Sequence, residues 1–130
     1  MGSAPISRAS VILDEMNIWK EGRYLDAWSV NHLLSGAIFT GWLLTFGLNI
    51  LIIFFLHLVL AIVWEIFEAL FGICEHLSNR IMDVVVGNIG FFLVYIFSIN
   101  FYVLIALTSL YLFMQILGYL AYRKRVSIKQ

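Results

Sequence analysis

The sequence predicts an all-α integral membrane protein, a bundle of four transmembrane helices with an interfacial helix at its N-terminus. Two features predict this class. Hydrophobic residues make up 62% of the 130 residues and charged residues only 12%, whereas a soluble domain carries about 25% charged residues. The apolar residues are also gathered into four long runs, without the alternation that marks membrane β-strands. A chain of this length holds a single membrane domain.

The first 27 residues are polar and include seven charged groups, with no apolar run long enough for a signal peptide. Ile12, Met16 and Trp19 lie at helical spacing beside acidic and basic side chains. This pattern is typical of a helix that lies in the membrane interface. A soluble helix and a disordered arm are the alternatives for the same residues.

Four apolar runs follow, and each can form a helix that crosses a bilayer. A helix rises ~1.5 Å per residue, so about 20 apolar residues cross the hydrocarbon core. The connections at 47–49 (GLN) and 98–100 (SIN) carry no charge and predict tight turns. The expected spans are residues 28–46, 50–72, 81–97 and 101–122.

All eight Lys and Arg residues fall on one side of a protein with these four spans. Three precede the first span, Arg80 lies between the second and third, and four follow the last. Basic residues collect on the cytoplasmic side, so both termini and the single cysteine, Cys74, should face the cytoplasm. One cysteine also excludes an internal disulfide. The chain then divides into a cytoplasmic or interfacial segment (1–27), a transmembrane domain (28–122) and a basic cytoplasmic tail (123–130).

Polar residues within the spans are expected to meet at one depth. From His32 to the turn at Leu48 is 16 residues, and from Leu48 to Glu65 is 17, so the first hairpin returns Glu65 to the depth of His32. Glu68 lies near the end of the second span, and Asp83 lies near the start of the third. The sequence therefore predicts that His32, Glu65, Glu68 and Asp83 line a polar pocket at the cytoplasmic membrane boundary, because charged groups in a bilayer point towards partners or a cavity.

One histidine and three carboxylates are compatible with three kinds of chemistry. The four residues could bind a divalent metal ion, because oxygen and imidazole ligands suit such cations, and carboxylates at positions i and i+3 can converge on one ion. Closely spaced carboxylates could instead supply an acid and a base, or a proton path. The structural alternative is a hydrogen-bonded network that fixes helix register, with Asn79 or Arg80 as a partner. The candidate catalytic and metal-binding residues are the same four: His32, Glu65, Glu68 and Asp83.

The third span presents one face of small and polar residues. Asn79, Asp83, Gly87 and Gly90 are spaced by four, four and three residues, which places them on one side of a helix. Glycines on such a face allow two helices to approach closely. His57 lies deep in the second span, where we expect packing and hydrogen bonding rather than a ligand role.

Two stretches, YLDAWSVNHLLSGAIFTGW and VWEIFEALFGICEHLSNRIMDVVVGNIGFF, resemble the VanZ-like membrane proteins and their bacterial relatives. The shared pattern is Asp, then His and a small residue, then a WE-x-x-E helix, then Asn/Asp-x-x-x-Asp-x-x-x-small-x-x-Gly. The chain departs from it at Gly87, where Asn or Asp is frequent, and has Asn88 one position later. The resemblance covers about residues 24–95 and implies a small polytopic membrane protein; its best-known namesake is linked to glycopeptide resistance, and no particular reaction is implied. The matching positions are Asp26, His32, Gly36, Trp64, Glu65, Glu68, Asn79, Asp83, Gly87 and Gly90.

Two functions of different classes follow from these features. The protein could be a membrane enzyme or ligand binder whose pocket acts on the headgroup of a lipid or envelope precursor. It could instead be a structural or accessory subunit of a larger membrane complex, in which the polar cluster orders the helices. The expected partners are membrane lipids, and other membrane subunits or a second copy of the chain. The net charge of zero gives no reason to expect nucleic acid.

Overall fold

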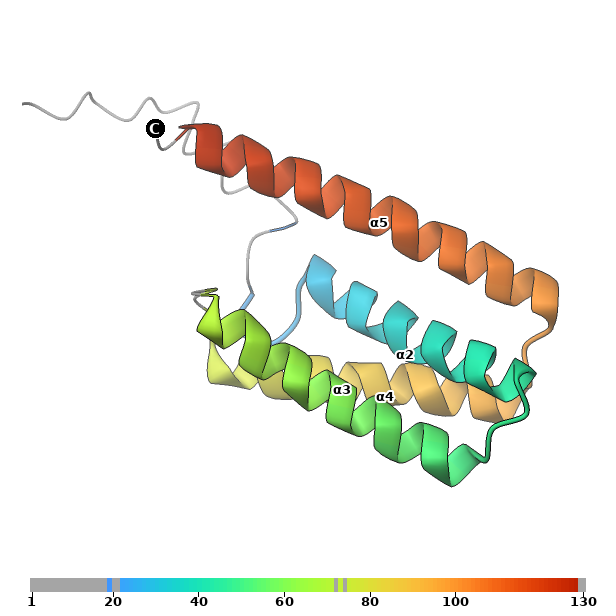
Figure 1. Ribbon diagram of the computed structural model, residues 1–130. Coiled ribbons are helices and arrows are strands. Elements are labelled where there is room, and N and C mark those ends of the chain that lie inside the picture. Colours follow the sequence, from blue (N-terminus) through green and yellow to red (C-terminus); the bar gives the residue numbers. More distant parts are fainter. Residues whose placement is uncertain (1–18, 20–21, 72, 74, 129–130) are drawn as a thin grey trace, which may run out of the picture.

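The computed structural model describes residues 19, 22–71, 73 and 75–128. In this part of the chain there are four helices: α2 (Ala27–Thr45), α3 (Ile50–Leu70), α4 (Leu77–Phe97) and α5 (Phe101–Ile128). Successive helices run in opposite directions, so the start of α2, the end of α3, the start of α4 and the end of α5 lie at one end of the bundle (Figure 1). We call this the polar end. The interfacial helix predicted for the first 27 residues lies almost wholly outside the described residues.

Three of the helices are long and apolar enough to cross a membrane: α3, α4, and the part of α5 from Phe101 to Ala121. They confirm the prediction of an all-helical membrane protein. Helix α4 begins at Leu77, before the predicted span at 81–97, and α5 continues to Ile128, beyond the predicted span at 101–122. Hydropathy detects the apolar part of a helix and not its polar continuation, and the apolar part of α5 ends at Ala121.

Helix α2 is the centre of the bundle. It packs against α3, α4 and α5, most extensively against α4, whereas α3 and α5 do not pack against each other. The figure shows α2 between α5 on one side and α3 and α4 on the other (Figure 1). The helix with the most polar face is therefore the one that its neighbours cover most completely from the surroundings of the bundle. Its buried residues are Ser29, Asn31, Leu34, Gly36, Ala37, Thr40 and Gly41.

Glycines bring the backbones of α2 and α4 into contact. A side chain at Gly36 would collide with the main-chain carbonyl of Gly87, and one at Gly90 would collide with the carbonyl of Leu33. Asn79, Asp83, Gly87 and Gly90 are all buried, as their helical spacing predicts. The absence of side chains here lets α2 and α4 lie close enough for short polar groups to meet across their interface.

The helix ends set the depth of the polar residues. Asp26 caps the start of α2, where its side chain accepts hydrogen bonds from the main-chain N–H of Trp28 at 2.8 Å and of Ser29 at 3.2 Å. At the opposite end of the bundle, the two tight turns predicted from the sequence contain residues with positive φ, Gly47 at 76° and Ser98 at 46°. The cap fixes where α2 begins, and the turns reverse the chain after comparable helix lengths.

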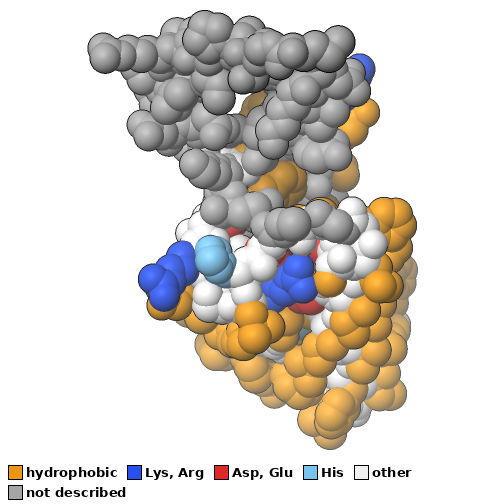
Figure 2. Space-filling view, turned by 90° about the vertical axis from the view of Figure 1, so that its left-hand side faces the viewer, with side chains coloured by type: hydrophobic (Ala, Val, Ile, Leu, Met, Phe, Trp, Pro, Cys, Tyr) orange, Lys and Arg blue, Asp and Glu red, His pale blue; other side chains and the backbone are white. Residues whose placement is uncertain are grey.

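The surface of the bundle has an apolar flank and a polar end. Large hydrophobic side chains are exposed along α3, α4 and α5. Figure 2 looks onto the polar end, where Arg, acidic and His side chains gather, while hydrophobic side chains cover the flank. An apolar belt of this kind is what a bilayer requires of a protein surface.

Candidate functional site

Three helices bring His32, Glu65 and Asp83 together at the polar end. His32 Nε2 lies 3.9 Å from Glu65 Oε1 and 3.9 Å from Asp83 Oδ2. One ligand atom from each residue can be chosen so that all lie within 4.8 Å of one another. Two ligand atoms at ordinary bond lengths on one tetrahedral ion lie about 3.4 Å apart. The observed spacing therefore needs only a small inward movement of side chains to surround a cation.

Glu65 is buried and has no hydrogen-bond partner in the part of the chain that the structure describes. The residue is 8% exposed, and neither of its carboxylate oxygens has a partner among the described residues. A buried carboxylate without a partner is costly, and native proteins normally pair such a group or use it to bind a metal. The nitrogen His32 Nε2 lies 3.9 Å from its Oε1, beyond hydrogen-bond distance. The site is thus incomplete as a purely hydrogen-bonded network.

The carboxylate of Asp83, unlike that of Glu65, accepts hydrogen bonds from neighbouring side chains. Its Oδ1 accepts a hydrogen bond from Ser29 Oγ at 2.6 Å, and its Oδ2 accepts one from Asn79 Nδ2 at 3.3 Å. The residue is 1% exposed. These bonds hold the carboxylate in one orientation with Oδ2 towards His32. Such support from a second layer of residues is typical of metal ligands and also of structural networks.

Asn79 links the beginnings of α2 and α4. Its amide nitrogen lies within hydrogen-bond distance of Asp26 Oδ2 at 3.1 Å and Glu75 Oε1 at 2.6 Å, in addition to Asp83. A single NH₂ group has two hydrogens for these three acceptors. The amide therefore sits among more negative charge than it can satisfy.

Glu68 belongs to a second group of acids. The structure places it with Glu65 and Glu75, with one oxygen of each within 4.8 Å of the others. Three residues along a helix correspond to a rotation of about 60° short of a full turn, so Glu68 leaves α3 in a different direction from Glu65, and it lines the same pocket as His32. The four predicted residues thus belong to two overlapping groups of three that share Glu65, with Glu75 as the added member.

The partners of this second group are few. Glu68 Oε1 accepts a hydrogen bond from Trp64 Nε1 at 2.8 Å, in an exposed position. Glu75 Oε2 lies 3.6 Å from Arg80 Nε. Arg80 also donates to the main-chain carbonyl of Ile73 at 3.0 Å. Arg80 and Asn79 are thus the two partners that a structural network would use, as the sequence indicated.

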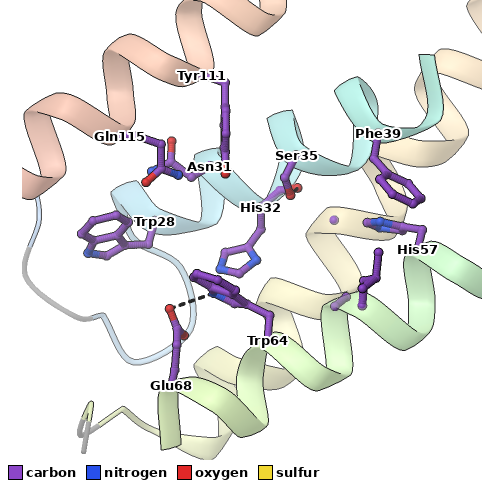
Figure 3. Close-up of a pocket in the computed structure, with 13 residues that line it drawn as sticks. Trp28, Asn31, His32, Ser35, Phe39, His57, Trp64, Glu68, Tyr111 and Gln115 are labelled. Carbon is purple, nitrogen blue, oxygen red and sulfur yellow. Dashed lines mark hydrogen bonds between the residues drawn. The ribbon is translucent and has the colours of Figure 1, made fainter. Parts of the chain in front are cut away.

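A pocket of about 240 Å³ opens beside these acids. It lies over α2, between α3 and α5, and His32 and Glu68 form part of its wall (Figure 3). Asn31 also reaches it, and this residue is 3% exposed with neither side-chain amide atom hydrogen-bonded to a described residue. The pocket therefore combines unsatisfied polar groups with an apolar wall. Its lining consists of Trp28, Asn31, His32, Ser35, Phe39, His57, Leu60, Ala61, Trp64, Glu68, Gly87, Tyr111 and Gln115.

His57 lies further along the same pocket, away from the acids. Its ring is stacked on that of Phe91 at 6.3 Å between centroids and lies 5.9 Å from that of Phe39. The residue is thus held by aromatic packing, and its buried Nε2 has no hydrogen-bond partner among the described residues. The figure shows His57 beside Phe39, with Trp64 and His32 between it and Glu68 (Figure 3).

Two kinds of residue escaped the sequence prediction. Glu75 follows the end of α3 in a connection without helical spacing, so no periodic pattern could place it beside Glu65. Asn31 and Gln115 are single polar residues within apolar helices, and that isolation is a usable signal because a polar side chain in a bilayer normally faces the interior.

Comparisons of the chain with protein families, with characterised proteins and with solved structures found no significant match to any of the three.

Proposed function

We propose that this protein is a four-span integral membrane protein that binds a divalent cation through His32, Glu65 and Asp83 and uses it on the headgroup of a lipid or envelope precursor. The observation that carries the proposal is the buried, unpartnered carboxylate of Glu65, which lies beside a histidine and a fixed aspartate. A cation would supply the partner that the described residues do not. The proposal is also in keeping with membership of the VanZ-like proteins.

Helix α2 is the fourth span in this proposal. It has 19 residues, is antiparallel to α3 and α5 and parallel to α4, and is surrounded by helices that are themselves apolar enough to cross a membrane. A helix in this central position has little contact with lipid, so it can carry Asn31, His32 and Thr40 without exposing them to hydrocarbon.

The distribution of basic residues supports a cytoplasmic location for both termini. In sequence, all eight Lys and Arg residues precede α2, lie at the start of α4, or fall in the last turns of α5 and beyond. We expect a membrane-impermeant maleimide to leave Cys74 unlabelled in intact cells and to label it after the membrane is opened. Labelling from outside in intact cells would reverse the orientation and move the polar end to the other face.

The ligand set favours a transition metal over magnesium or calcium. One imidazole with carboxylates suits Zn²⁺, Mn²⁺ or Fe²⁺, whereas Mg²⁺ and Ca²⁺ prefer oxygen alone. Such an ion polarises a phosphoryl or carbonyl oxygen or activates a bound water. Glu68 lies in the pocket wall next to His32, where a carboxylate can accept a proton from a water or hydroxyl group.

The position of the pocket supports a lipid as the ligand. Helices α3 and α5 do not pack against each other, so the pocket between them faces the side of the bundle rather than only its end. Leu60 and Trp64 in its wall are 51% and 52% exposed. A molecule with an acyl or isoprenoid chain could lie along this apolar side while its headgroup reaches His32 and Glu68.

Elemental analysis of the protein purified in detergent tests the cation site. We expect bound transition metal in the wild type and its loss in His32→Ala, Glu65→Gln and Asp83→Asn. His76→Ala is the matched control, because His76 is exposed and its side chain makes no capping hydrogen bond. Wild-type protein that contains no metal and takes up neither Zn²⁺ nor Mn²⁺ on dialysis would contradict the proposal.

A structural or accessory role is the second candidate. The observation in its favour is the hydrogen-bonded part of the cluster, in which Asn79 contacts Asp26, Glu75 and Asp83 and so fixes α2 against α4. This role predicts that each substitution lowers stability and that none changes metal content. The same set of variants therefore separates the two functions.

A further inference from the structure

Glu65 belongs to both groups of acids at the polar end. One group contains His32, Glu65 and Asp83, and the other contains Glu65, Glu68 and Glu75. Both oxygens of Glu65 are buried and have no hydrogen-bond partner among the described residues. One oxygen lies towards the histidine, at 3.9 Å from its Nε2. A carboxylate in this position can bind one cation with each oxygen.

The formal charges at the polar end also favour the binding of cations. Five carboxylates are connected here by short contacts, and Arg80 is the one Lys or Arg among the described residues that is paired with any of them. With all five ionised and His32 neutral, four negative charges remain. Like charges at this spacing repel strongly where water is scarce. Two divalent cations would neutralise them. The five are Asp26, Glu65, Glu68, Glu75 and Asp83.

We propose that the polar end holds two divalent cations bridged by the Glu65 carboxylate. His32 and Asp83 complete the first position, and Glu68 and Glu75 complete the second. This inference rests on the cation site of the proposed function and adds a second ion to it. In carboxylate-rich two-metal sites the ions lie about 3.5–4 Å apart, a separation that one bridging carboxylate can span.

The two positions differ in their ligands and in their exposure. The first has a nitrogen ligand and lies among buried residues, whereas the second has oxygen ligands alone. His32 and Glu68 both line the pocket, so a molecule in the pocket can reach both ions. The second position should therefore bind its cation more weakly and accept Mn²⁺ readily, because oxygen ligands suit Mn²⁺.

Arg80 is compatible with this arrangement. It approaches Glu75 at 3.6 Å, a distance beyond a close hydrogen bond, and Glu75 Oε2 has no hydrogen-bond partner among the described residues. The other oxygen of Glu75 accepts from Asn79 at 2.6 Å. Glu75 can thus be held by Asn79 through one oxygen and bind a cation through the other.

The test is the number of Mn²⁺ ions bound per chain in full-length protein in detergent, measured by titration together with electron paramagnetic resonance. We expect two ions in the wild type, with the second bound at higher Mn²⁺ concentration, and an exchange-coupled spectrum when both are present. Glu68→Gln and Glu75→Gln should each bind one ion and give the six-line spectrum of isolated Mn²⁺. Glu65→Gln should lose both ions, and His76→Ala should keep both.

The other possible outcomes distinguish a failure of the second ion from a failure of the proposed function. One ion in the wild type, unchanged in Glu68→Gln and Glu75→Gln, would overturn the second ion and leave the proposed function standing. Two ions without exchange coupling would overturn the bridge. No bound ion at all would overturn both proposals. The wild-type titration and spectrum need no variant, so a variant that fails to fold does not remove the test.

Discussion

Helices α2 and α5 pack against each other, yet their residues have opposite character. In α2 most of the buried residues are small or polar, among them Ser29, Asn31 and Thr40. In α5 the described side chains are mostly aliphatic and aromatic, and most are exposed, although Leu104 at 2% exposure and Gly118 are buried. Apolar composition in this protein therefore marks helices that face outwards, whereas polar composition marks the helix that its neighbours enclose.

The physical reason lies in the solvent around each helix. A bilayer does not drive apolar helices together, since lipid tails are as apolar as the side chains. Close packing of small residues and hydrogen bonds between polar ones must supply the association instead. We therefore expect substitutions at the α2–α4 interface to matter far more than substitutions on the outer faces of α3 and α5.

The largest expected effect on stability is that of Gly36→Ala. The added methyl group would meet the main-chain carbonyl of Gly87, and a backbone cannot turn away as a side chain can. We expect a loss of about 3 kcal/mol in the free energy of unfolding, the upper part of the range for overpacking. Unfolding in mixed detergent measures it.

Ala69→Leu is the control for that substitution, because Ala69 is exposed on α3. The change should be within about 0.5 kcal/mol of the wild type. Equal stability losses in the two variants would show that α2 and α4 are not in backbone contact.

A smaller loss is expected for Asp83→Ala in metal-free protein. The substitution leaves Ser29 Oγ without its acceptor at 2.6 Å and removes one acceptor of Asn79. Leaving a buried donor unpaired costs about 1–3 kcal/mol. Glu68→Ala is the comparison, because its one described hydrogen bond is exposed, and it should cost less than about 1 kcal/mol. Thermal unfolding in chelator measures both, and equal costs would contradict the difference in burial.

The sequence was sufficient for the class of fold and for the depth of the polar residues. Hydropathy located the helices, and counting residues through the turn at 47–49 placed His32 and Glu65 at the same level. It could not assign Glu68 and Glu75 to a separate group, because that depends on helix rotation and on the path of a connection that has no periodicity. Nor could it show that Glu65 lacks partners while Asp83 has two, since partners depend on packing between helices distant in sequence.

The smallest expected change in stability, and the most informative, is that of Glu65→Gln in metal-free protein. Glu65 and Asp83 are both buried carboxylates beside His32, but Glu65 accepts no hydrogen bond from a described residue. Its removal therefore breaks nothing, and replacing a buried charge with a neutral amide lowers the cost of burial. We expect stability equal to or slightly above that of the wild type when chelator is present.

When metal is added, the wild type should become more stable than Glu65→Gln. A ligand at 100 times its dissociation constant stabilises the folded state by about 2.7 kcal/mol, so the wild type should gain this amount with Zn²⁺ or Mn²⁺ and Glu65→Gln should not. Thermal unfolding of both proteins, with and without metal, gives the four stabilities that test this prediction. If Glu65→Gln is less stable than the wild type in chelator and metal changes neither protein, then Glu65 orders the helices through contacts of its own. In that case the difference between Glu65 and Asp83 has no bearing on function.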